Sequence, residues 1–511
     1  YGLADRGVGL PIAVANYWCL NSVGCTLYFL RMVAGPGGGM GGGRPVFCSF
    51  DLSAAAPKET VHGTGGGYEI SADGKKMLLS RDGSFAIIDL PKGPLPERLE
   101  PLNVGNMEVR LDRQAERRQT YHESWRQMRD FFYHPEMHGV DWPAIRKKYE
   151  VLLPYVRHRA DLIYVIGEMI SELNCGHAYV GGGELPQPRR IPMGMLGAEF
   201  KRDASGFHQI TRILPGGNWD KKFRSPLTEM GVNVAVGEFI VAIDGQPTDK
   251  AATLNELLIG AAGREVQLRV NKEPKLEGSR EVVVVPIADE AELYYQEWVK
   301  KNRDYVEKQT GGKVGYLHVP DMLTGGLIEF TRQFYPQLRK KALIIDMRGN
   351  GGGNVSPQLI ERLRREMIMI DITRNGQPRP NPGDQMVGPM VCLLNEFSAS
   401  DGDLFPFRFK AHKLGKLIGK RSWGGVVGIR GTLPLLDGGT LNRPEFSRYD
   451  VKGKEWIIEG YGVDPDIVVD NDPAEEFAGK DAQLDRAIQE ILEELKTKEV
   501  NLPPPPPGPK K

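Results

Sequence analysis

The alternation of apolar runs and helical patterns between residues 289 and 470 constrains the fold of this chain more than any other feature of its sequence. Short apolar runs are typical of buried strands, and the segments between them repeat apolar residues at helical spacing. The expected strands are residues 314–319, 343–346 and 390–394, and the expected helices are residues 323–339, 355–368 and 399–412. Strands that alternate with helices predict βαβ units and a mostly parallel sheet. Because sites in such sheets lie beyond the carboxyl ends of strands, the loops after these strands are the first candidates for chemistry.

The first of these loops, residues 346–354, reads DMRGNGGGN. Its consecutive glycines let backbone N–H groups face one hollow without side chains in the way. Such a concave, partly positive surface suits an oxyanion. A tight turn from strand to helix would use the same residues, and the loop taken alone favours that simpler interpretation.

The second loop, residues 395–403, reads NEFSASDGD and runs straight into an expected helix. Ser400 falls at the N-terminus of that helix, where the helix dipole favours a developing anion. Its small neighbours Ala399 and Gly402 leave room for a substrate. A serine in this place is ordinarily a helix cap. What indicates acyl transfer, with Ser400 as the nucleophile, is the pairing of a serine with a glycine loop on another strand end.

A serine nucleophile needs a general base, and the chain has nine histidines that can supply one. His177, in the string CGHAY, stands where the helical segment ends and the next segment begins, which is a natural place for a cleft. We expect His177 to be the base, although a structural role explains a histidine there equally well. His318 falls within an expected strand. Three further histidines are expected on the surface of the helical segment: His134, His138 and His158.

The base in turn needs a group that orients it. Glu459 follows an apolar strand and precedes a glycine-containing turn, so its side chain can point into the cleft at the edge of the sheet. Asp464 and Asp466 flank a proline, and we expect these two residues to stabilise a turn instead.

Two other kinds of structure precede the alternating segment. Residues 1–95 read as short strands joined by Asp-Gly turns at 73–74 and 82–83, and three such strands are typical of one blade of a β-propeller. The glycine-rich run 35–43 is expected to be a flexible loop rather than a phosphate-binding loop, because no Gly-Lys-Ser/Thr follows it. Residues 106–185 carry apolar positions at helical spacing and predict a small helical domain.

Residues 190–288 are strand-rich, with one expected helix at 254–262. The string GEFIVAIDGQ, residues 237–246, is similar to the late part of a PDZ domain, a fold that captures extended peptide as an added strand. A small β-barrel that only spaces its neighbours is the alternative. The proline-rich tail, residues 503–509, is expected to be extended and unpacked.

Composition argues against several kinds of partner. Lys plus Arg and Asp plus Glu both total 66, so no net charge favours nucleic acid or an anionic lipid surface.

The five cysteines are scattered without a CxxC pair, which argues against a disulfide framework and against a zinc site. Residues 11–30 are apolar, but Asn16, Asn21, Ser22 and Gly24 interrupt them, so strands broken by a turn are favoured over a membrane span.

Four ordered strings give the sequence a resemblance to a known family: DMRGNGGG, NEFSASDGD, KRSWGGVVGI and EGYGVDPDI. Together they resemble the tail-specific (C-terminal processing) serine peptidases, and within that clan they are most similar to the tricorn peptidases. The resemblance covers residues 60–470 and implies a multidomain α+β chain. The implied parts are a β-propeller remnant at 1–100, a helical domain carrying the base at 106–186, a PDZ-like domain at 190–288, an α/β catalytic domain of the crotonase/ClpP-like kind at 289–475, and a C-terminal helix with the tail at 476–511.

The resemblance also implies roles for single residues. Ser400 matches the family nucleophile, His177 matches its base, and Glu459 matches the acidic member of its charge network. The amides of Gly351 and Asp401 match the oxyanion hole, and the carboxylate of Asp401 would favour a basic residue before the cut.

One position departs from the family pattern. Tricorn peptidases carry a serine immediately before the histidine, and this serine links the histidine to the glutamate. The present chain has Gly176 there, so either a water or a different contact connects His177 with Glu459, or Glu459 matters less.

The resemblance implies a serine peptidase that hydrolyses short peptides without a metal or organic cofactor. The alternatives are a non-catalytic ligand-binding protein and a PDZ scaffold on the same fold. Peptides are the expected substrates and a homo-oligomer, a hexamer in this family, the expected assembly, with no nucleic acid or membrane partner. The expected compartment is the cytoplasm, with periplasm or export left open. Because the chain begins with Tyr1 rather than Met, we expect it to be the later part of a longer protein or a processed product.

Overall fold

The structure, a computed structural model, describes all residues except 1–6, 8, 13, 33–44, 432 and 509–511. The chain falls into two compact units, Tyr1–Leu111 and Asp112–Lys511. The glycine-rich run 35–43 lies outside the described residues. Among the residues described, no helix is both long enough and apolar enough to cross a membrane.

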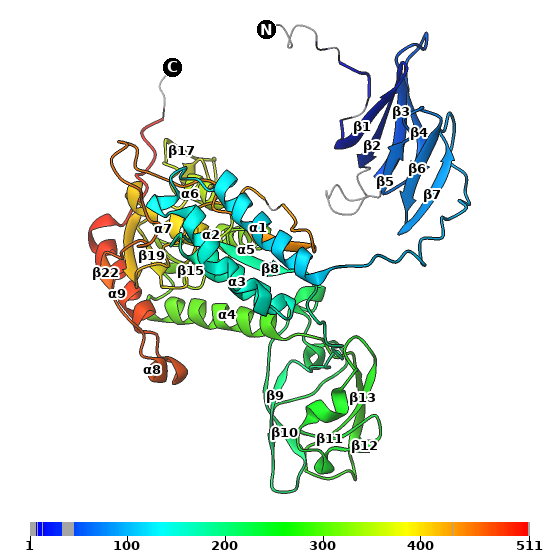
Figure 1. The fold of residues 1–511 in the computed structure, drawn as a ribbon. Coiled ribbons are helices and arrows are strands. Elements are labelled where there is room, and N and C mark those ends of the chain that lie inside the picture. The colour runs from blue at the N-terminus through cyan, green and yellow to red at the C-terminus, as the bar shows by residue number, and fades with distance from the viewer. Residues whose placement is uncertain (1–6, 8, 13, 33–44, 432, 509–511) are drawn as a thin grey trace. The chain divides into compact units, whose positions relative to one another are not determined.

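The first unit is built of two antiparallel sheets, with the strand orders β1-β2-β3-β4 and β5-β6-β7 (blue in Figure 1). Its strands are β1 (Tyr17–Val23), β2 (Thr26–Met32), β3 (Pro45–Asp51), β4 (Glu59–Thr64), β5 (Gly67–Ile70), β6 (Lys76–Arg81) and β7 (Ser84–Asp89). The chain turns between β1 and β2 at Gly24, whose φ is 58°, as the interrupted apolar run predicted. Asp82 and Gly83 both have positive φ, which the two-residue hairpin between β6 and β7 requires.

The second unit begins with three helices, α1 (Arg113–Phe131), α2 (Trp142–Glu150) and α3 (Arg159–Ser171). The carboxylate of Asp112 caps α1, because it accepts hydrogen bonds from the first free N–H groups of that helix. Apolar side chains of the three helices meet in one core, which includes Tyr121, Trp125, Trp142, Leu162, Ile166 and Met169. The helical pattern that the sequence predicted is therefore present in the structure.

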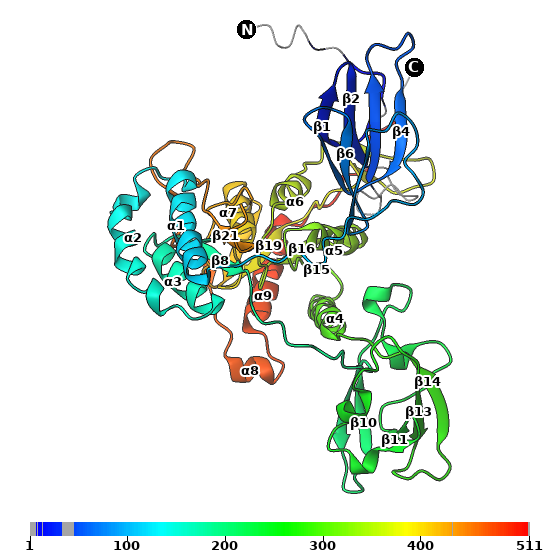
Figure 2. The same cartoon turned by 45° about the vertical axis from the view of Figure 1, so that its right-hand side comes forward.

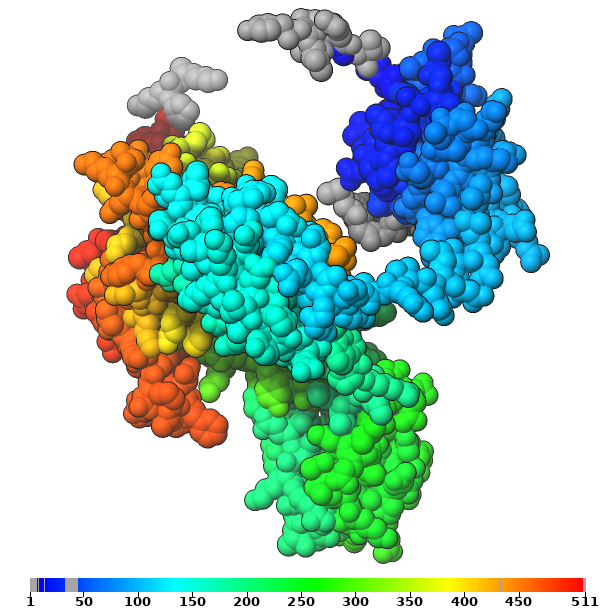
Figure 3. All heavy atoms as spheres, viewed as in Figure 1, coloured from blue at the N-terminus to red at the C-terminus, as the bar shows by residue number. Residues whose placement is uncertain are grey.

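The loop that carries His177 is anchored at both of its ends. It follows α3 and continues into β8 (Tyr179–Gly182), which pairs antiparallel with β21 (Gly439–Asn442) from the last part of the chain. Leu441 of β21 also enters the core of the three helices. Figure 3 shows the helical segment in cyan lying against orange residues of that last part. The helical segment and the parallel sheet domain are thus joined next to His177.

Residues 198–284 form an antiparallel sheet of six strands with the order β14-β13-β11-β10-β9, in which β12 pairs with β11. The strands are β9 (Ala198–Arg202), β10 (His208–Ile213), β11 (Phe239–Ile243), β12 (Gln246–Pro247), β13 (Val266–Asn271) and β14 (Arg280–Val284). The expected helix at 254–262 is wrong: only a 3₁₀ turn forms, at Leu254–Leu258. Gly260 has φ 71° and donates its N–H to Pro192, so the chain leaves the helical path there.

Residues 314–468 contain a five-stranded sheet with the order β15-β16-β19-β20-β22, and all of its neighbours are parallel. The strands are β15 (Val314–His318), β16 (Ala342–Asp346), β19 (Met390–Leu394), β20 (Gly415–Gly419) and β22 (Ile467–Val468), and a separate hairpin is formed by β17 (Met369–Asp371) and β18 (Arg379–Asn381). Every residue of β15, β16 and β19 is buried. The sequence prediction of a parallel sheet that contains these three strands is confirmed.

Helices cover both faces of the parallel sheet (Figure 2). Residues that alternate along the strands belong to two different cores, as side chains on opposite faces must. The helices on one face are α4 (Ala291–Gln309) and α9 (Ala482–Lys498), and those on the other are α5 (Thr324–Phe334), α6 (Ser356–Leu363) and α7 (Asp401–Ala411). The short helix α8 (Pro473–Phe477) precedes α9.

Candidate active site

Ser400 lies between the carboxyl end of β19 and the first turn of α7, in a strained backbone conformation. Its φ is 57° and its ψ is −117°, a combination that L-residues rarely adopt. It is the N-cap residue of α7, yet its side chain makes no capping hydrogen bond. Neighbouring Ser398 anchors the loop instead, because its hydroxyl donates to the carbonyl of Met347 at 2.9 Å. The Ser400 hydroxyl is therefore left for chemistry.

The glycine loop after β16 packs directly against the Ser400 loop. The N–H of Ala399 donates to the carbonyl of Asn350 at 2.8 Å. A Cβ atom at Gly352 would lie 2.6 Å from the Cβ of Ser400, and one at Gly402 would lie 2.3 Å from the carbonyl oxygen of Asn350. Only glycine permits backbones to approach so closely at these two positions. The two loops do lie side by side, as neighbouring parallel strands predicted.

Two backbone N–H groups beside Ser400 remain free to bind an oxygen. The N–H groups of Gly349 and Gly352 are occupied by side-chain oxygens of Asn395 and Asn350, each at 3.0 Å. Within the described part of the chain, the N–H groups of Gly351 and Asp401 have no acceptor. A Cβ atom at Gly351 would meet nothing within 4 Å, so open space adjoins that amide. Free N–H groups on both sides of a serine are what an oxyanion hole requires.

His177 occupies the loop between α3 and β8 with a φ of 60°. Its ring meets Trp423 and Tyr179 edge-on, at centroid distances of 5.7 and 6.2 Å. Burial lowers the pKa of the imidazole, the charge of Glu459 opposes this effect, and Arg448 adds to it. The lowered pKa favours a neutral imidazole, the form that accepts a proton. Among the described residues, its buried Nδ1 atom has no hydrogen-bond partner.

The segment Trp423–Val427 connects the two candidate catalytic residues. The N–H of Trp423 donates to the carbonyl of Ser398 at 3.0 Å, next to the nucleophile. The N–H of Gly424 donates to the carboxylate of Asp403 at 2.7 Å, in the first turn of α7. The ring of Trp423 contacts His177, so one short segment touches the surroundings of both residues.

Glu459 binds the backbone on both sides of the candidate site rather than the His177 ring. Its Oε1 atom accepts from the N–H of Gly176 at 2.7 Å. Its Oε2 atom accepts from the N–H groups of Val426 and Val427 at 2.6 and 2.9 Å. A Cβ atom at Gly176 would lie 2.9 Å from Oε1 of Glu459, so glycine at this position allows the direct contact. The departure at Gly176 therefore has a structural account: the glutamate holds the histidine loop by its main chain.

The expected role of Asp401 in selecting a basic substrate residue does not fit its surroundings. Its side chain is buried, and its carboxylate accepts from the N–H of Ser356 at 2.8 Å and from the Ser356 hydroxyl at 2.5 Å. Arg408 completes an ion pair with the same carboxylate at 3.1 Å. A carboxylate that is already paired and buried has no free charge for a substrate cation. The Asp401 amide, in contrast, stays beside Ser400.

Asp464 and Asp466 stabilise the turn that follows Glu459, as the sequence predicted. Asp464 pairs with Arg421 at 2.7 Å. Asp466 accepts from the N–H of Leu417 at 2.9 Å and so ties the turn to β20.

Two residues near the site were not singled out from the sequence, Trp423 and Asp403. Asp403 is completely buried and burial raises its pKa from 3.8 to about 6. The signal for both lay in the strings SASDGD and SWGG, where a charged or aromatic residue stands among small ones. Their function in joining two loops depends on tertiary packing, which neither string reveals.

In the described ranges, no group of three or more His, Cys, Asp or Glu residues could hold a metal ion. All five cysteines are free thiols.

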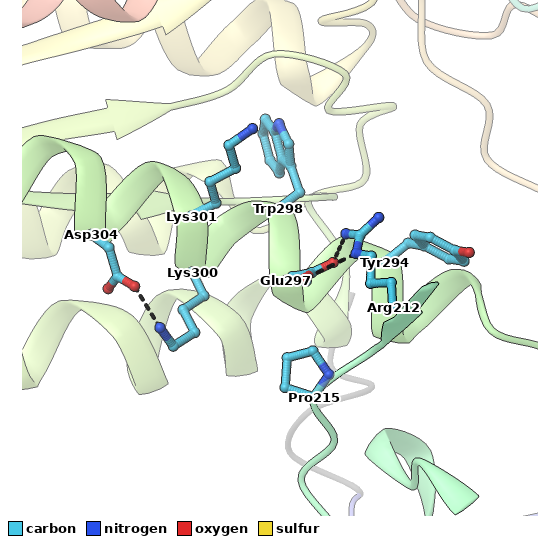
Figure 4. Close-up of a pocket in the computed structure, with 8 residues that line it drawn as sticks. All are labelled: Arg212, Pro215, Tyr294, Glu297, Trp298, Lys300, Lys301 and Asp304. Atoms are coloured by element: carbon cyan, nitrogen blue, oxygen red, sulfur yellow. Dashed lines mark hydrogen bonds and ion pairs between the residues drawn. The ribbon is translucent and has the colours of Figure 1, made fainter. Parts of the chain in front are cut away.

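A groove of about 730 Å³ runs along α4 (Figure 4), but its lining contains none of the candidate catalytic residues. The residues that line it are Arg212, Pro215, Tyr294, Glu297, Trp298, Lys300, Lys301 and Asp304.

Three family profiles match the second unit in order along the chain. The tricorn protease C1 domain matches residues 113–171 and the tricorn protease PDZ domain matches residues 194–289. Peptidase family S41 matches residues 313–469, which include the parallel sheet, the glycine loop and Ser400.

Individual relatives agree with these profiles. The chain is 36% identical to tricorn protease homolog 1 of Streptomyces coelicolor over 98% of this chain and 48% of the relative, and 34% identical to the tricorn protease of Thermoplasma volcanium over 85% of this chain and 42% of the relative. A crystal structure of the tricorn protease matches with a TM-score of 0.85 and 30% identity, over 97% of this chain and 48% of that chain. The chain spans about half the length of the curated relatives it matches. It belongs to the tricorn protease family.

Proposed function

We propose that this chain hydrolyses peptide bonds as a serine peptidase, with Ser400 as the nucleophile and His177 as the general base. The observation that carries the proposal is the meeting of the two loops at Ser400. There, a hydroxyl without a capping bond adjoins the glycine loop, and the N–H groups of Gly351 and Asp401 have no acceptor in the described part of the chain. Membership of a family of peptidases agrees with this chemistry.

The proposed reaction has two steps, the acylation of Ser400 and the release of the acyl group by water. The Ser400 oxygen attacks the carbonyl carbon of a peptide bond while the neutral imidazole of His177 takes the hydroxyl proton. The carbonyl oxygen becomes an oxyanion, which accepts hydrogen bonds from the N–H groups of Gly351 and Asp401. The C–N bond then breaks and His177 donates its proton to the leaving amine. Water, deprotonated by His177, releases the acyl group from Ser400 and restores the hydroxyl.

Glu459 is proposed to orient the base through the main chain. It holds the N–H of Gly176, the residue before His177, and the N–H groups of Val426 and Val427. Its negative charge also favours the imidazolium that forms in the transition state, since it raises the pKa of His177. The serine that connects histidine and glutamate in the family is then not needed in this chain.

The substrates are proposed to be peptides, because the site has the chemistry for acyl transfer and the chain carries a segment that matches a PDZ domain. Assembly into a hexamer and a cytoplasmic location stay predictions from family resemblance. A non-catalytic binding protein or scaffold is the alternative, and the intact Ser400, His177 and glycine loop argue against it.

A fluorophosphonate probe tests the proposal directly, because it phosphonylates only a serine that is activated by a base and an oxyanion hole. Labelling of the full chain is expected at Ser400, as located by peptide mass spectrometry. The variants Ser400→Ala and His177→Ala are expected to lose labelling and peptide hydrolysis together. Removal of one oxyanion donor typically lowers turnover by about 10²–10³-fold, and loss of the nucleophile should exceed that.

Matched controls are two exposed residues outside the site: Ser171, the last residue of α3, and His158, its N-cap. Ser171→Ala and His158→Asn are expected to label and hydrolyse like the parent chain. Hydrolysis that persists in Ser400→Ala, or labelling of another serine, would disprove the assignment of this site.

A further inference from the structure

A buried network of charges holds the start of the glycine loop, with Arg348 at its centre. Arg348 is 8% exposed and Asp346 is 0% exposed. The guanidinium binds the Asp346 carboxylate with two nitrogens: Nη2 lies 2.6 Å from Oδ2 and Nε lies 3.0 Å from Oδ1. Burial acts to raise the pKa of Asp346, but the charge and the hydrogen bonds of Arg348, together with His318, outweigh burial and hold that pKa below its usual range. The pair is therefore ionised in the folded chain.

The remaining guanidinium nitrogen of Arg348 reaches α9. Its Nη1 atom donates to Oδ1 of Asp481 at 2.8 Å and to Oε1 of Gln483 at 3.1 Å. Asp481 is also the N-cap of α9, where the same oxygen accepts the N–H of Leu484 at 3.0 Å. One carboxylate thus caps the C-terminal helix and binds the arginine under the glycine loop.

The main chain of Arg348 is fixed as firmly as its side chain. Its N–H donates to the carboxylate of Asp346 at 3.0 Å, and its carbonyl accepts from Nε2 of His318 at 2.9 Å. A carbonyl only accepts, so Nε2 of His318 carries the hydrogen and Nδ1 accepts from the hydroxyl of Tyr295 at 3.0 Å. Burial lowers the pKa of His318, which agrees with this neutral form.

The amide of Gly351 lies three residues after Arg348 in the same loop. No hydrogen bond in the described part of the chain holds its N–H, and apart from Gly351 and its two chain neighbours no heavy atom lies within 4 Å of where its Cβ would be. Asn350, one residue earlier, is fixed by its side-chain bond to the carbonyl of Val319 at 2.8 Å. Arg348, two residues before Asn350, is the other fixed point of this loop. A shift of Arg348 would therefore be passed on to the Gly351 amide.

We propose that Asp481 and Gln483 are positioning residues for the active site: through Arg348 they aim the Gly351 amide at the oxyanion. This inference rests on the proposed function and extends it to α9, which lies beyond residue 469, where the match to peptidase family S41 ends. It makes the C-terminal helix part of the catalytic apparatus. Loss of Asp481 leaves Arg348 paired with Asp346 and removes one of the two acceptors of its Nη1 atom, so the loop is expected to move.

The test is Asp481→Ser in the full chain, because serine keeps the helix cap but is too short to reach Arg348. The rate of Ser400 phosphonylation and kcat for a peptide are expected to fall roughly tenfold to a hundredfold, since a displacement of about 1 Å can cost that much. KM is expected to stay within about twofold, because substrate binding in the ground state does not use the oxyanion hole. A peptide aldehyde, which forms an oxyanion on Ser400, is expected to lose affinity by the same factor as kcat.

The matched control is Asp472→Ser, which makes the same change at the cap of the neighbouring helix α8, on an exposed residue outside the network. It should leave kcat and phosphonylation unchanged. Asp481→Asn preserves the cap and the acceptor oxygen but not the charge. It is expected to show a smaller loss than Asp481→Ser, and it serves as the test if the serine variant does not fold.

The outcomes separate this inference from the proposed function. If Ser400→Ala removes labelling and turnover while both Asp481 variants match the parent, the peptidase assignment stands and the role of α9 is refuted. The role of α9 is also refuted if the loss of kcat equals the loss of folded protein that thermal unfolding measures. If the parent chain shows no Ser400-dependent labelling, the proposed function itself is refuted.

Discussion

At the scale of single residues, three residues of the proposed site have a strained backbone. His177, Ser400 and Ile458 have φ values of 60°, 57° and 72°, although none of them is glycine. Such conformations cost on the order of 1–3 kcal/mol each and persist only when the surroundings impose them. Ile458 is the least suited of the three because it is β-branched, and it directly precedes Glu459. The packing that imposes this strain also fixes the nucleophile, the base and the orienting glutamate.

The pKa of His177 sets the acid limit of the proposed activity. Burial lowers it below the ordinary value of 6.5, the charge of Glu459 raises it and Arg448 lowers it. The acid limb of kcat/KM against pH is expected to have its midpoint below that value. In Glu459→Gln the charge that raises the pKa is absent, so the midpoint is expected to move to lower pH. A pH profile of both proteins measures this, and movement to higher pH would contradict the assignment.

The buried carboxylate of Asp403 makes stability depend on pH. Its pKa rises from 3.8 to about 6 on burial, so between these values the folded chain binds more protons than the unfolded chain. The free energy of unfolding is therefore expected to increase as pH falls from about 7 to about 4, by about 2–3 kcal/mol from this residue. Asp403→Asn removes the titrating group and is expected to lose that increase. Urea unfolding of both proteins across the range tests this, and identical pH dependence would count against it.

At the scale of elements, the site depends on the contact between the loops that follow β16 and β19. These strands are parallel neighbours, so their carboxyl ends share one edge of the sheet. Close backbone contact then brings the glycine loop against Ser400, and Trp423–Val427 adds a third segment that reaches the His177 loop. Three loops from one sheet domain and one loop from the helical segment thus converge.

Two adjacent glycines of this contact are expected to respond differently to the same substitution. Gly352 has φ 97°, and a Cβ there would lie 2.6 Å from Ser400, so Gly352→Ala is expected to lower the free energy of unfolding by about 2 kcal/mol or more. Gly351 has open space around its Cβ position, so Gly351→Ala is expected to change stability by less than about 1 kcal/mol. Urea unfolding measures both changes. Equal losses would show that the loops are not packed as described.

At the scale of the whole molecule, the chain is two units, of which the second carries all candidate catalytic residues. Residues 101–111, at the end of the first unit, are exposed and form no helix or strand. The candidate site is assembled entirely within Asp112–Lys511, from the helical segment and the parallel sheet domain.

Limited proteolysis is expected to reflect this division. Trypsin is expected to cut early after Arg110, in the exposed segment, and to leave a fragment of the second unit that still labels at Ser400. Mass spectrometry of the first products identifies the cut. Early cleavage within the parallel sheet domain, with loss of labelling, would contradict the independence of the second unit.

The sequence predicted the parts of this account that depend on local pattern. Apolar runs and helical spacing predicted β15, β16 and β19 as strands of a mostly parallel sheet, and position at strand ends predicted that the Ser400 and glycine loops would meet. Sequence pattern could not predict three other features: the orientation of Asp401, the short turn at 254–258 and the network from Arg348 to α9. Each depends on which distant segment occupies the neighbouring space: Ser356 for Asp401, Pro192 for the turn and Asp481 for Arg348.

The most direct test of the central claim is a crystal structure of the chain after phosphonylation with a fluorophosphonate. The adduct is expected on the Oγ atom of Ser400, with the His177 ring within hydrogen-bond reach of that oxygen or of an adduct oxygen. One phosphonyl oxygen is expected about 2.7–3.1 Å from the N–H groups of both Gly351 and Asp401. An adduct whose oxygen points away from both amides, or a His177 ring far from Ser400, would contradict the proposed catalytic site.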